Sequence, residues 1–174
     1  MKKIVSSALL LAGLFISCTS HAQQDKGKRP SPPAIVTQVT KSGAEISIDY
    51  SQPSVKGRTI GKDLEPKDGE VWRTGANEAT VFETSKDIKV EGNNLPAGKY
   101  GLFTISGKDS WTIIFNKTWK QWGAFTYKQA DDILRVTVKP QKADAFAEKM
   151  TFTIDKSGVV TLLWGDIKVA FTTE

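Results

Sequence analysis

The side chains best suited to chemistry in this chain gather in one short string, residues 71–80, which reads Val-Trp-Arg-Thr-Gly-Ala-Asn-Glu-Ala-Thr. Arg73 carries a planar fork of hydrogen-bond donors that suits a carboxylate or a phosphate. Asn77 and Glu78 add an amide and an acceptor. Together these three residues predict a site for a small anionic or polyhydroxylated ligand. The alternative is that Arg73 pairs with Glu78 while Asn77 shapes a tight backbone turn.

Two further groups of residues could contribute to such a site. Lys56 and Arg58 flank a glycine in a small basic turn, which either meets an anionic group or is an ordinary exposed turn. Trp119 and Trp122 lie in the polar stretch 117–128, where their flat rings either stack on a sugar or cap the end of a core. The candidate ligand-binding residues are therefore Arg73, Asn77, Glu78, Arg58, Lys56, Trp122 and Trp119.

Several familiar catalytic groups are missing from the main part of the chain. The only cysteine is Cys18 and the only histidine is His21, so residues 34–174 contain neither an imidazole nor a thiol. This excludes a Ser-His-Asp triad, a Cys-His pair and a histidine-ligated zinc site there. The four carboxylates within residues 63–70 do not follow the spacing of an EF-hand loop. We therefore assign no catalytic residue, no metal ligand and no cofactor.

The first 22 residues have the three parts of a secretory signal: two lysines, an apolar run over residues 4–17, and small residues at positions 20 and 22. Cleavage after Ala22 predicts an exported protein, periplasmic or secreted. The sequence ending in Cys18, Phe-Ile-Ser-Cys, also loosely resembles a lipobox, in which the cysteine is lipidated. That alternative predicts a membrane-anchored lipoprotein, and membrane contact is expected only through this anchor.

The remainder of the chain divides into a tether and one domain. Residues 23–33 are polar and basic and include three prolines, which predicts a flexible tether. Residues 34–174 have the length of a single domain. The formal net charge of the whole chain is +5, but basic and acidic residues are interspersed, so nucleic-acid binding is not expected. The sequence gives no indication of the oligomeric state.

The dominant hydrophobic period in the domain is two, which is typical of strands with one buried face. Residues 44–50 and 133–139 alternate strictly between apolar and polar side chains. Further strand candidates are residues 35–40, 79–84, 88–90, 99–105, 111–116, 150–155, 159–164 and 168–172. The pattern predicts an all-β fold, an antiparallel β-sandwich or jelly-roll-like barrel of about nine or ten short strands. The only helical pattern is residues 142–149, so at most one short helix is expected.

An ordered set of segments carries a resemblance to a known family. The segments are Tyr-Ser-Gln-Pro at 50–53, Lys-Gly-Arg at 56–58, the string 71–80, the turn and strand at 95–103, Gln-Trp-Gly-Ala-Phe at 121–125 and Leu-Trp at 163–164. In these the chain resembles DUF2911, a family of exported bacterial proteins of unknown function, from about residue 31 to the C-terminus. The resemblance implies an exported, mostly β single domain, joined in some longer relatives to helical repeats. It implies no established activity and no catalytic residues.

One departure from the family pattern lies before the string 71–80. Members of the family usually have Pro-Tyr-Gly there, whereas this chain has Pro66-Lys67-Asp68-Gly69, with an extra residue and no tyrosine. If that tyrosine lines a site in relatives, the site is altered here.

Taken together, the sequence favours a binding domain over an enzyme. The leading expectation is an exported β-sandwich that binds a small polar or anionic ligand or an envelope glycan. One alternative is a carboxylate-dependent hydrolase of envelope polymers, with Glu78 as general acid or base. The other is a structural or protein-interaction domain of the cell envelope.

Overall fold

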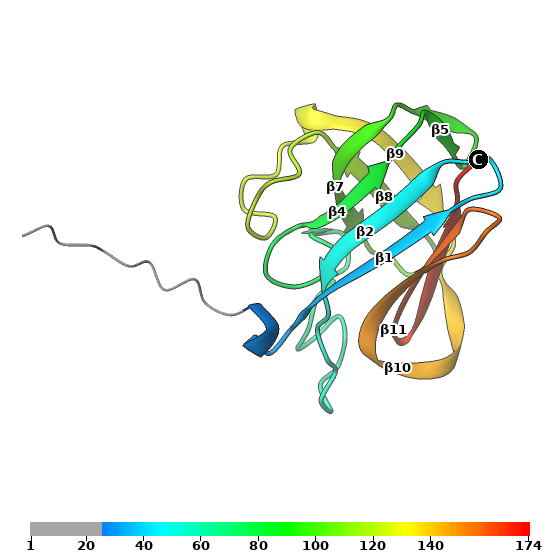
Figure 1. Cartoon of the computed structure of the whole chain (residues 1–174). Helices are drawn as coiled ribbons and strands as arrows, with labels where there is room; N and C mark the ends of the chain where they lie inside the picture. Colours follow the sequence, from blue (N-terminus) through cyan, green and yellow to red (C-terminus); the bar gives the residue numbers. More distant parts are fainter. Residues whose placement is uncertain (1–25) are drawn as a thin grey trace, which may run out of the picture.

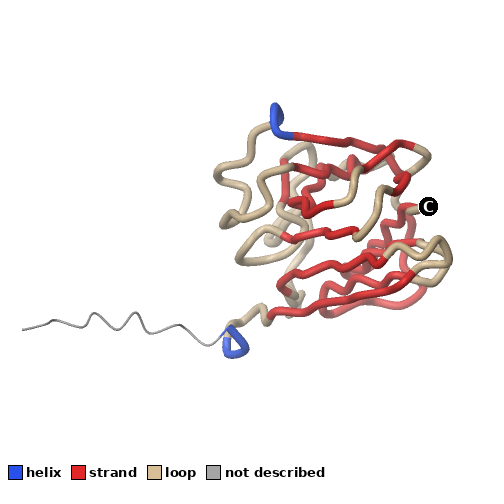
Figure 2. The backbone as a smooth tube through the Cα atoms, turned by 45° about the horizontal axis from the view of Figure 1, so that its top comes forward, coloured by secondary structure: helices blue, strands red, loops and turns tan. Residues whose placement is uncertain are grey.

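The computed structural model describes residues 26–174. The predicted signal peptide, the alternative prediction of lipidation at Cys18 and the histidine at position 21 concern residues outside the described part. Strands make up most of the described part, and its helical content is two short 3₁₀ turns, η1 (Lys26–Lys28) and η2 (Gln129–Asp131) (Figure 2). Within residues 26–174, no helix has the length and apolar character needed to cross a membrane.

One large antiparallel sheet forms the first layer. Its strands follow the order β1-β2-β4-β7-β8-β9, and β3 pairs with β7 beside this path (Figure 1). The strand bounds are β1 Pro33–Val39, β2 Glu45–Ser51, β3 Val71–Trp72, β4 Thr80–Thr84, β7 Gly98–Ile105, β8 Trp111–Asn116 and β9 Asp132–Val138. The strict alternation of residues 44–50 is visible in β2, where Ile46, Ile48 and Tyr50 are buried on one face.

Two hairpins complete the domain. The long hairpin pairs β10 (Gln141–Ile154) with β11 (Val159–Thr172) and forms the second layer (Figure 1). A short hairpin pairs β5 (Ile88–Val90) with β6 (Asn93–Leu95). The sheets do not close into a barrel, so the fold is an antiparallel β-sandwich, as predicted.

The core lies between the large sheet and the long hairpin. The ring of Phe115 packs edge-on against Phe82 at 5.0 Å and against Phe171 of β11 at 5.9 Å, measured between ring centroids. Tyr50 of β2 meets Phe152 of β10 in the same way at 5.0 Å. Such edge-to-face contacts join the two layers. The tryptophans at positions 72, 111 and 164 are all buried in this core.

The predicted helical pattern at residues 142–149 is wrong. These residues belong to the strand β10, whose pairing with β11 shifts register between Lys142 and Ala147 and again between Ala147 and Thr151. Each register shift interrupts the alternation of apolar and polar residues along the strand. The apolar residues there are therefore spaced as they would be on one side of a helix. The predicted strands 159–164 and 168–172 are likewise one continuous strand, β11, which passes through Gly165 at φ +60°.

Candidate functional site

The string 71–80 folds into a tight loop that leads into β4. The indole Nε1 of Trp72 donates a hydrogen bond of 3.1 Å to the carbonyl of Gly75. The hydroxyl of Thr80 donates to the carbonyl of Thr74 at 2.8 Å, and both threonines are buried. A side chain at Gly75 would lie 2.9 Å from the Thr80 hydroxyl, so the loop has no room for one. These constraints fix the backbone from which Glu78 extends.

A second loop, residues 117–128, folds back over the outer face of the large sheet. The ring of Tyr127 packs on Phe103 of β7 with 5.1 Å between centroids, within a small cluster that also contains Ala79 and Ile114. A Cβ at Gly101 would lie 3.2 Å from the Thr118 carbonyl, so this glycine lets the loop approach the sheet closely. The loop thereby lies close against the sheet, beside the start of β4.

Backbone hydrogen bonds join the two loops. The Gly123 N–H donates to the carbonyl of Asn77 at 3.0 Å, and the Ala79 N–H donates to the carbonyl of Gln121 at 3.0 Å. Between these bonds, Glu78 and Trp122 form an antiparallel bridge. These bonds therefore place Glu78 and Trp122 side by side, although they lie about forty residues apart in the sequence.

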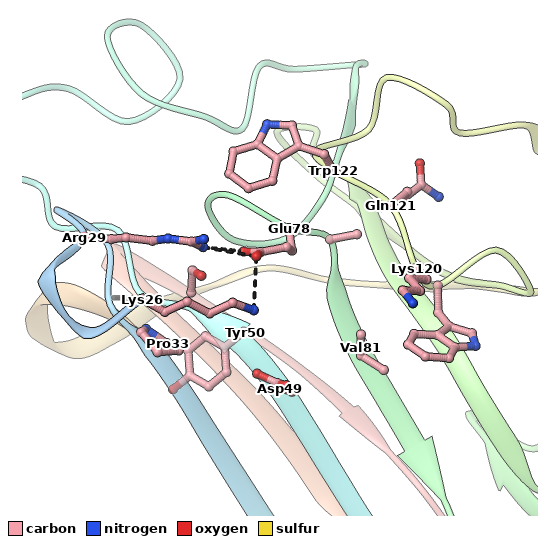
Figure 3. Close-up of a pocket in the computed structure, with 13 residues that line it drawn as sticks. Lys26, Arg29, Pro33, Asp49, Tyr50, Glu78, Val81, Lys120, Gln121 and Trp122 are labelled. Carbon is pink, nitrogen blue, oxygen red and sulfur yellow. Dashed lines mark hydrogen bonds and ion pairs between the residues drawn. The ribbon is translucent and has the colours of Figure 1, made fainter. Parts of the chain in front are cut away.

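Together the loops, the N-terminal segment and β2 enclose a half-open cleft of about 440 Å³ (Figure 3). Its lining residues are Lys26, Arg29, Pro33, Asp49, Tyr50, Ser51, Glu78, Ala79, Val81, Trp119, Lys120, Gln121 and Trp122. The lining is more apolar than polar, with a few convergent charged groups, which is typical of ligand sites.

Glu78 is the electrostatic centre of the cleft. Nη1 of Arg29 lies 3.1 Å from Oε1 and 2.8 Å from Oε2 of Glu78, and Nζ of Lys26 lies 3.2 Å from Oε1 (Figure 3). Partial burial acts to raise the pKa of Glu78, but a backbone hydrogen bond and the hydrogen bonds from Arg29 and Lys26 outweigh it and hold the pKa below its usual range. The carboxylate is therefore ionised over the neutral pH range.

Three of the predicted site residues line this cleft: Glu78, Trp119 and Trp122. The tryptophans are 38% and 55% exposed, respectively, so they do not cap the core. The alternative prediction, an ion pair between Arg73 and Glu78, is wrong, because Glu78 pairs with Arg29 and Lys26 instead.

Asn77 and Arg73 lie beside the cleft and do not line it. Asn77 has φ +59° and donates through its side-chain amide to the carbonyl of Ser31 at 3.0 Å, so it joins its loop to the N-terminal segment. Arg73 is half-buried, and its Nε has no hydrogen-bond partner among the described residues. Burial lowers the pKa of Arg73, and the charge of Glu65 acts in the opposite direction.

Lys56 and Arg58 also do not line the cleft. The Arg58 guanidinium donates to the carbonyls of Ser54 and Val55, at 2.7 and 3.1 Å. The Lys56 N–H donates to Oε1 of Glu148 in β10 at 2.8 Å. Both contacts stabilise the turn itself, which is the ordinary structural role weighed for these residues.

Sequence reasoning missed several cleft residues, above all Lys26 and Arg29. Both belong to the segment predicted as a tether, yet Arg29 is only 17% exposed and its guanidinium lies 5.8 Å from the ring centroid of Trp122. The sequence did show several basic residues close before the domain and an acidic candidate, Glu78, within it. Their spacing in the sequence does not show that they contact each other. Asp49 and Gln121 were missed because a strand end and a loop position carry no distinctive motif.

The lowered pKa of Glu78 gives a direct prediction. In a variant with Lys26→Ala and Arg29→Ala, burial still acts to raise the pKa but the two side-chain partners are gone, so the pKa is expected to rise. In the wild type, the ion pairs stabilise the docked segment fully at pH values above the ordinary carboxyl pKa of about 4.3. This stabilisation is lost as the pH falls through the lowered pKa of Glu78. NMR titration of the Glu78 carboxyl carbon measures both values, and equal values in the two proteins would contradict the assignment.

Comparison with known proteins adds one finding. No curated protein and no solved structure matches the chain. One family model does match, over residues 31–173, and its description is protein of unknown function, DUF2911. The matched range contains the whole sandwich and both loops of the cleft, whereas Lys26 and Arg29 precede it. The chain therefore belongs to the DUF2911 family, as its ordered segments indicated.

Proposed function

We propose that this domain is an exported binding module that holds a small polar ligand or an envelope glycan in the cleft beside the loops 71–80 and 117–128. The observation that carries the proposal is the pair of exposed indoles, Trp119 and Trp122, next to the ionised carboxylate of Glu78. Flat aromatic faces provide contact area for a sugar ring or an apolar stem, and a carboxylate accepts hydrogen bonds from hydroxyl or amine groups.

The charges of the cleft that lie outside the N-terminal segment favour a neutral or basic ligand over an anionic one. Arg73, Lys56 and Arg58 supported an anionic ligand, but none of them lines the cleft. Apart from Lys26 and Arg29 of the N-terminal segment, the lining contains two carboxylates, Asp49 and Glu78, and one lysine, Lys120. An anion would meet like charges at the two carboxylates.

Binding is also favoured over hydrolysis. A general acid that protonates a glycosidic oxygen needs a raised pKa. The pKa of Glu78 is lowered, because its hydrogen bonds to the backbone and to Arg29 and Lys26 outweigh the effect of burial. Glu78 therefore suits recognition of a ligand better than proton donation to one.

The proposal predicts a specific loss of binding in Trp122→Ala. We expect the Kd for soluble envelope glycans to rise at least tenfold, because truncating an aromatic hot-spot residue costs about 2 kcal/mol or more and about 1.4 kcal/mol corresponds to a factor of ten. Isothermal titration calorimetry with a panel of glycan fragments measures this. Phe125→Ala is the matched control, since Phe125 lies on the same loop, is 85% exposed and does not line the cleft.

Two results would count against this function. One is that the wild type binds no member of the panel. The other is that Trp122→Ala and Phe125→Ala bind as tightly as the wild type. Turnover of an envelope polymer that disappears in Glu78→Gln would instead favour the hydrolase.

A further inference from the structure

The occupant of the cleft in this chain is one of its own basic side chains. Arg29 reaches both oxygens of Glu78 and is only 17% exposed, whereas Lys26 contacts the same carboxylate and is 60% exposed (Figure 3). Arg29 is therefore the seated group and Lys26 the flanking one. A single nitrogen, Nη1, contacts both oxygens, so the contact is a charge-assisted hydrogen bond shared between the two carboxylate oxygens.

The wall around this guanidinium adds an aromatic face. The Cζ of Arg29 lies 5.8 Å from the ring centroid of Trp122, which is within the range of a cation–π contact. Trp122 itself is 55% exposed and is tied to Glu78 by the backbone bridge. A carboxylate and an indole fixed side by side select a cation that has a flat or apolar side, such as a guanidinium or an alkylammonium.

The charges of the wall agree with this selection. Without the N-terminal segment, the lining contains two carboxylates, Asp49 and Glu78, and one lysine, Lys120. The wall is then acidic overall, and the two cations that reverse its sign, Lys26 and Arg29, come from the segment. The family match begins at residue 31, so the acidic and aromatic wall lies inside the family domain and its occupant lies outside it.

The segment that supplies Arg29 lies at the surface. None of the residues of η1 is buried, and the Arg29 N–H donates to the Lys26 carbonyl over a long distance of 3.3 Å. Further along the chain, the carbonyl of Ser31 accepts from Asn77 and the carbonyl of Pro32 accepts from the Gln52 N–H. Partly exposed ion pairs are weak in water, so an external cation can compete for Glu78.

We propose that the cleft is a receptor for a basic peptide segment, and that residues 26–29 fill it as an internal, displaceable occupant. The inference rests on the proposed function and narrows its ligand to one that presents a guanidinium or an ammonium group to Glu78 and Trp122. A tethered occupant acts at an effective concentration in the millimolar range, so it competes strongly with free ligand. Removing its cations therefore opens the site.

The test uses the full chain and a synthetic peptide with the sequence of residues 26–31, Lys-Gly-Lys-Arg-Pro-Ser, blocked at both ends. We expect the peptide to bind the variant Lys26→Ala/Arg29→Ala at least tenfold more tightly than it binds the wild type. Adding Glu78→Gln to that variant is expected to abolish the gain. The matched control is Lys41→Ala/Lys156→Ala, which removes the same charge from exposed lysines that do not line the cleft.

The inference is overturned if the peptide binds the opened variant no more tightly than the wild type, or if its binding persists after Glu78→Gln. Thermal unfolding of each variant checks that it is folded, and Trp122→Ala replaces Glu78→Gln if the latter does not fold. The glycan titrations on the same proteins separate the two proposals. Glycan binding that depends on Trp122, without peptide binding, overturns this inference and leaves the proposed function standing.

Discussion

Replacing Trp72 by alanine is expected to lower the free energy of unfolding by about 3–5 kcal/mol, the usual loss when a large aromatic side chain is removed from a core. Trp72 is 2% exposed and is among the largest fully buried side chains of the described part. Its indole also donates to the carbonyl of Gly75, and an alanine leaves that acceptor without its partner. The loss therefore combines a cavity with an unsatisfied polar group in the loop that carries Glu78.

Two matched variants make this prediction sharp. Trp72→Phe keeps most of the apolar volume and loses the donor, so its effect is expected to lie between those of the wild type and Trp72→Ala. Trp122→Ala removes the same side chain from a position that is 55% exposed, and is expected to change stability by about 0.5 kcal/mol or less. Urea unfolding followed by circular dichroism measures all three. Equal losses in Trp72→Ala and Trp122→Ala would contradict the assigned role of Trp72.

The fold was largely predictable because the signals that carry it are local. Alternation within residues 44–50 and 133–139 corresponds directly to β2 and β9, since one face of each strand meets the core. The failure at residues 142–149 has an equally local cause. Register shifts in β10 remove the alternation on which such a prediction depends.

The candidate site was predictable only in part, because it forms from segments that are distant in the sequence. Glu78 and Trp122 were each identified as unusual residues, but only the backbone bridge between them makes them one site. Arg29 was missed because composition alone indicates a tether, and its contact with Glu78 spans 49 positions. Arg73 was overvalued because its donors suit an anion, whereas its place in the fold is half-buried and outside the cleft.

The well-bonded wall of the cleft and the exposed position of the segment that fills it fit together. The loop at 71–80 is fixed by buried hydroxyls, a tryptophan hydrogen bond and a glycine that has no room for a side chain. The loop at 117–128 is held to it by two backbone hydrogen bonds. Such fixed surroundings keep Glu78 and Trp122 in place whether or not Arg29 is present. A site that is already formed avoids the conformational cost of ordering itself around a ligand.

Gly158→Ala is expected to destabilise the domain by about 2–5 kcal/mol, from backbone strain of about 1–2 kcal/mol together with overpacking of about 1–3 kcal/mol. Gly158 has φ +93°, and a Cβ there would lie 2.0 Å from the backbone carbonyl oxygen of Thr173. The same glycine accepts bonds from the Thr173 N–H at 2.9 Å and from its hydroxyl at 2.6 Å, which attach the chain end to the β10–β11 turn. A backbone oxygen cannot move aside like a side chain, so either the turn or this attachment must shift.

Gly92→Ala separates the two contributions to that loss. Gly92 has a similar conformation, φ +76°, in the turn between β5 and β6, but a Cβ there would meet nothing within 4 Å. It is expected to show only the strain of about 1–2 kcal/mol. Thermal and urea unfolding of both variants give the difference, which reports the contact with Thr173. If Gly158→Ala is no less stable than Gly92→Ala, the close packing of the chain end against the hairpin turn is not a source of stability, and the hairpin layer must be held by its core residues alone.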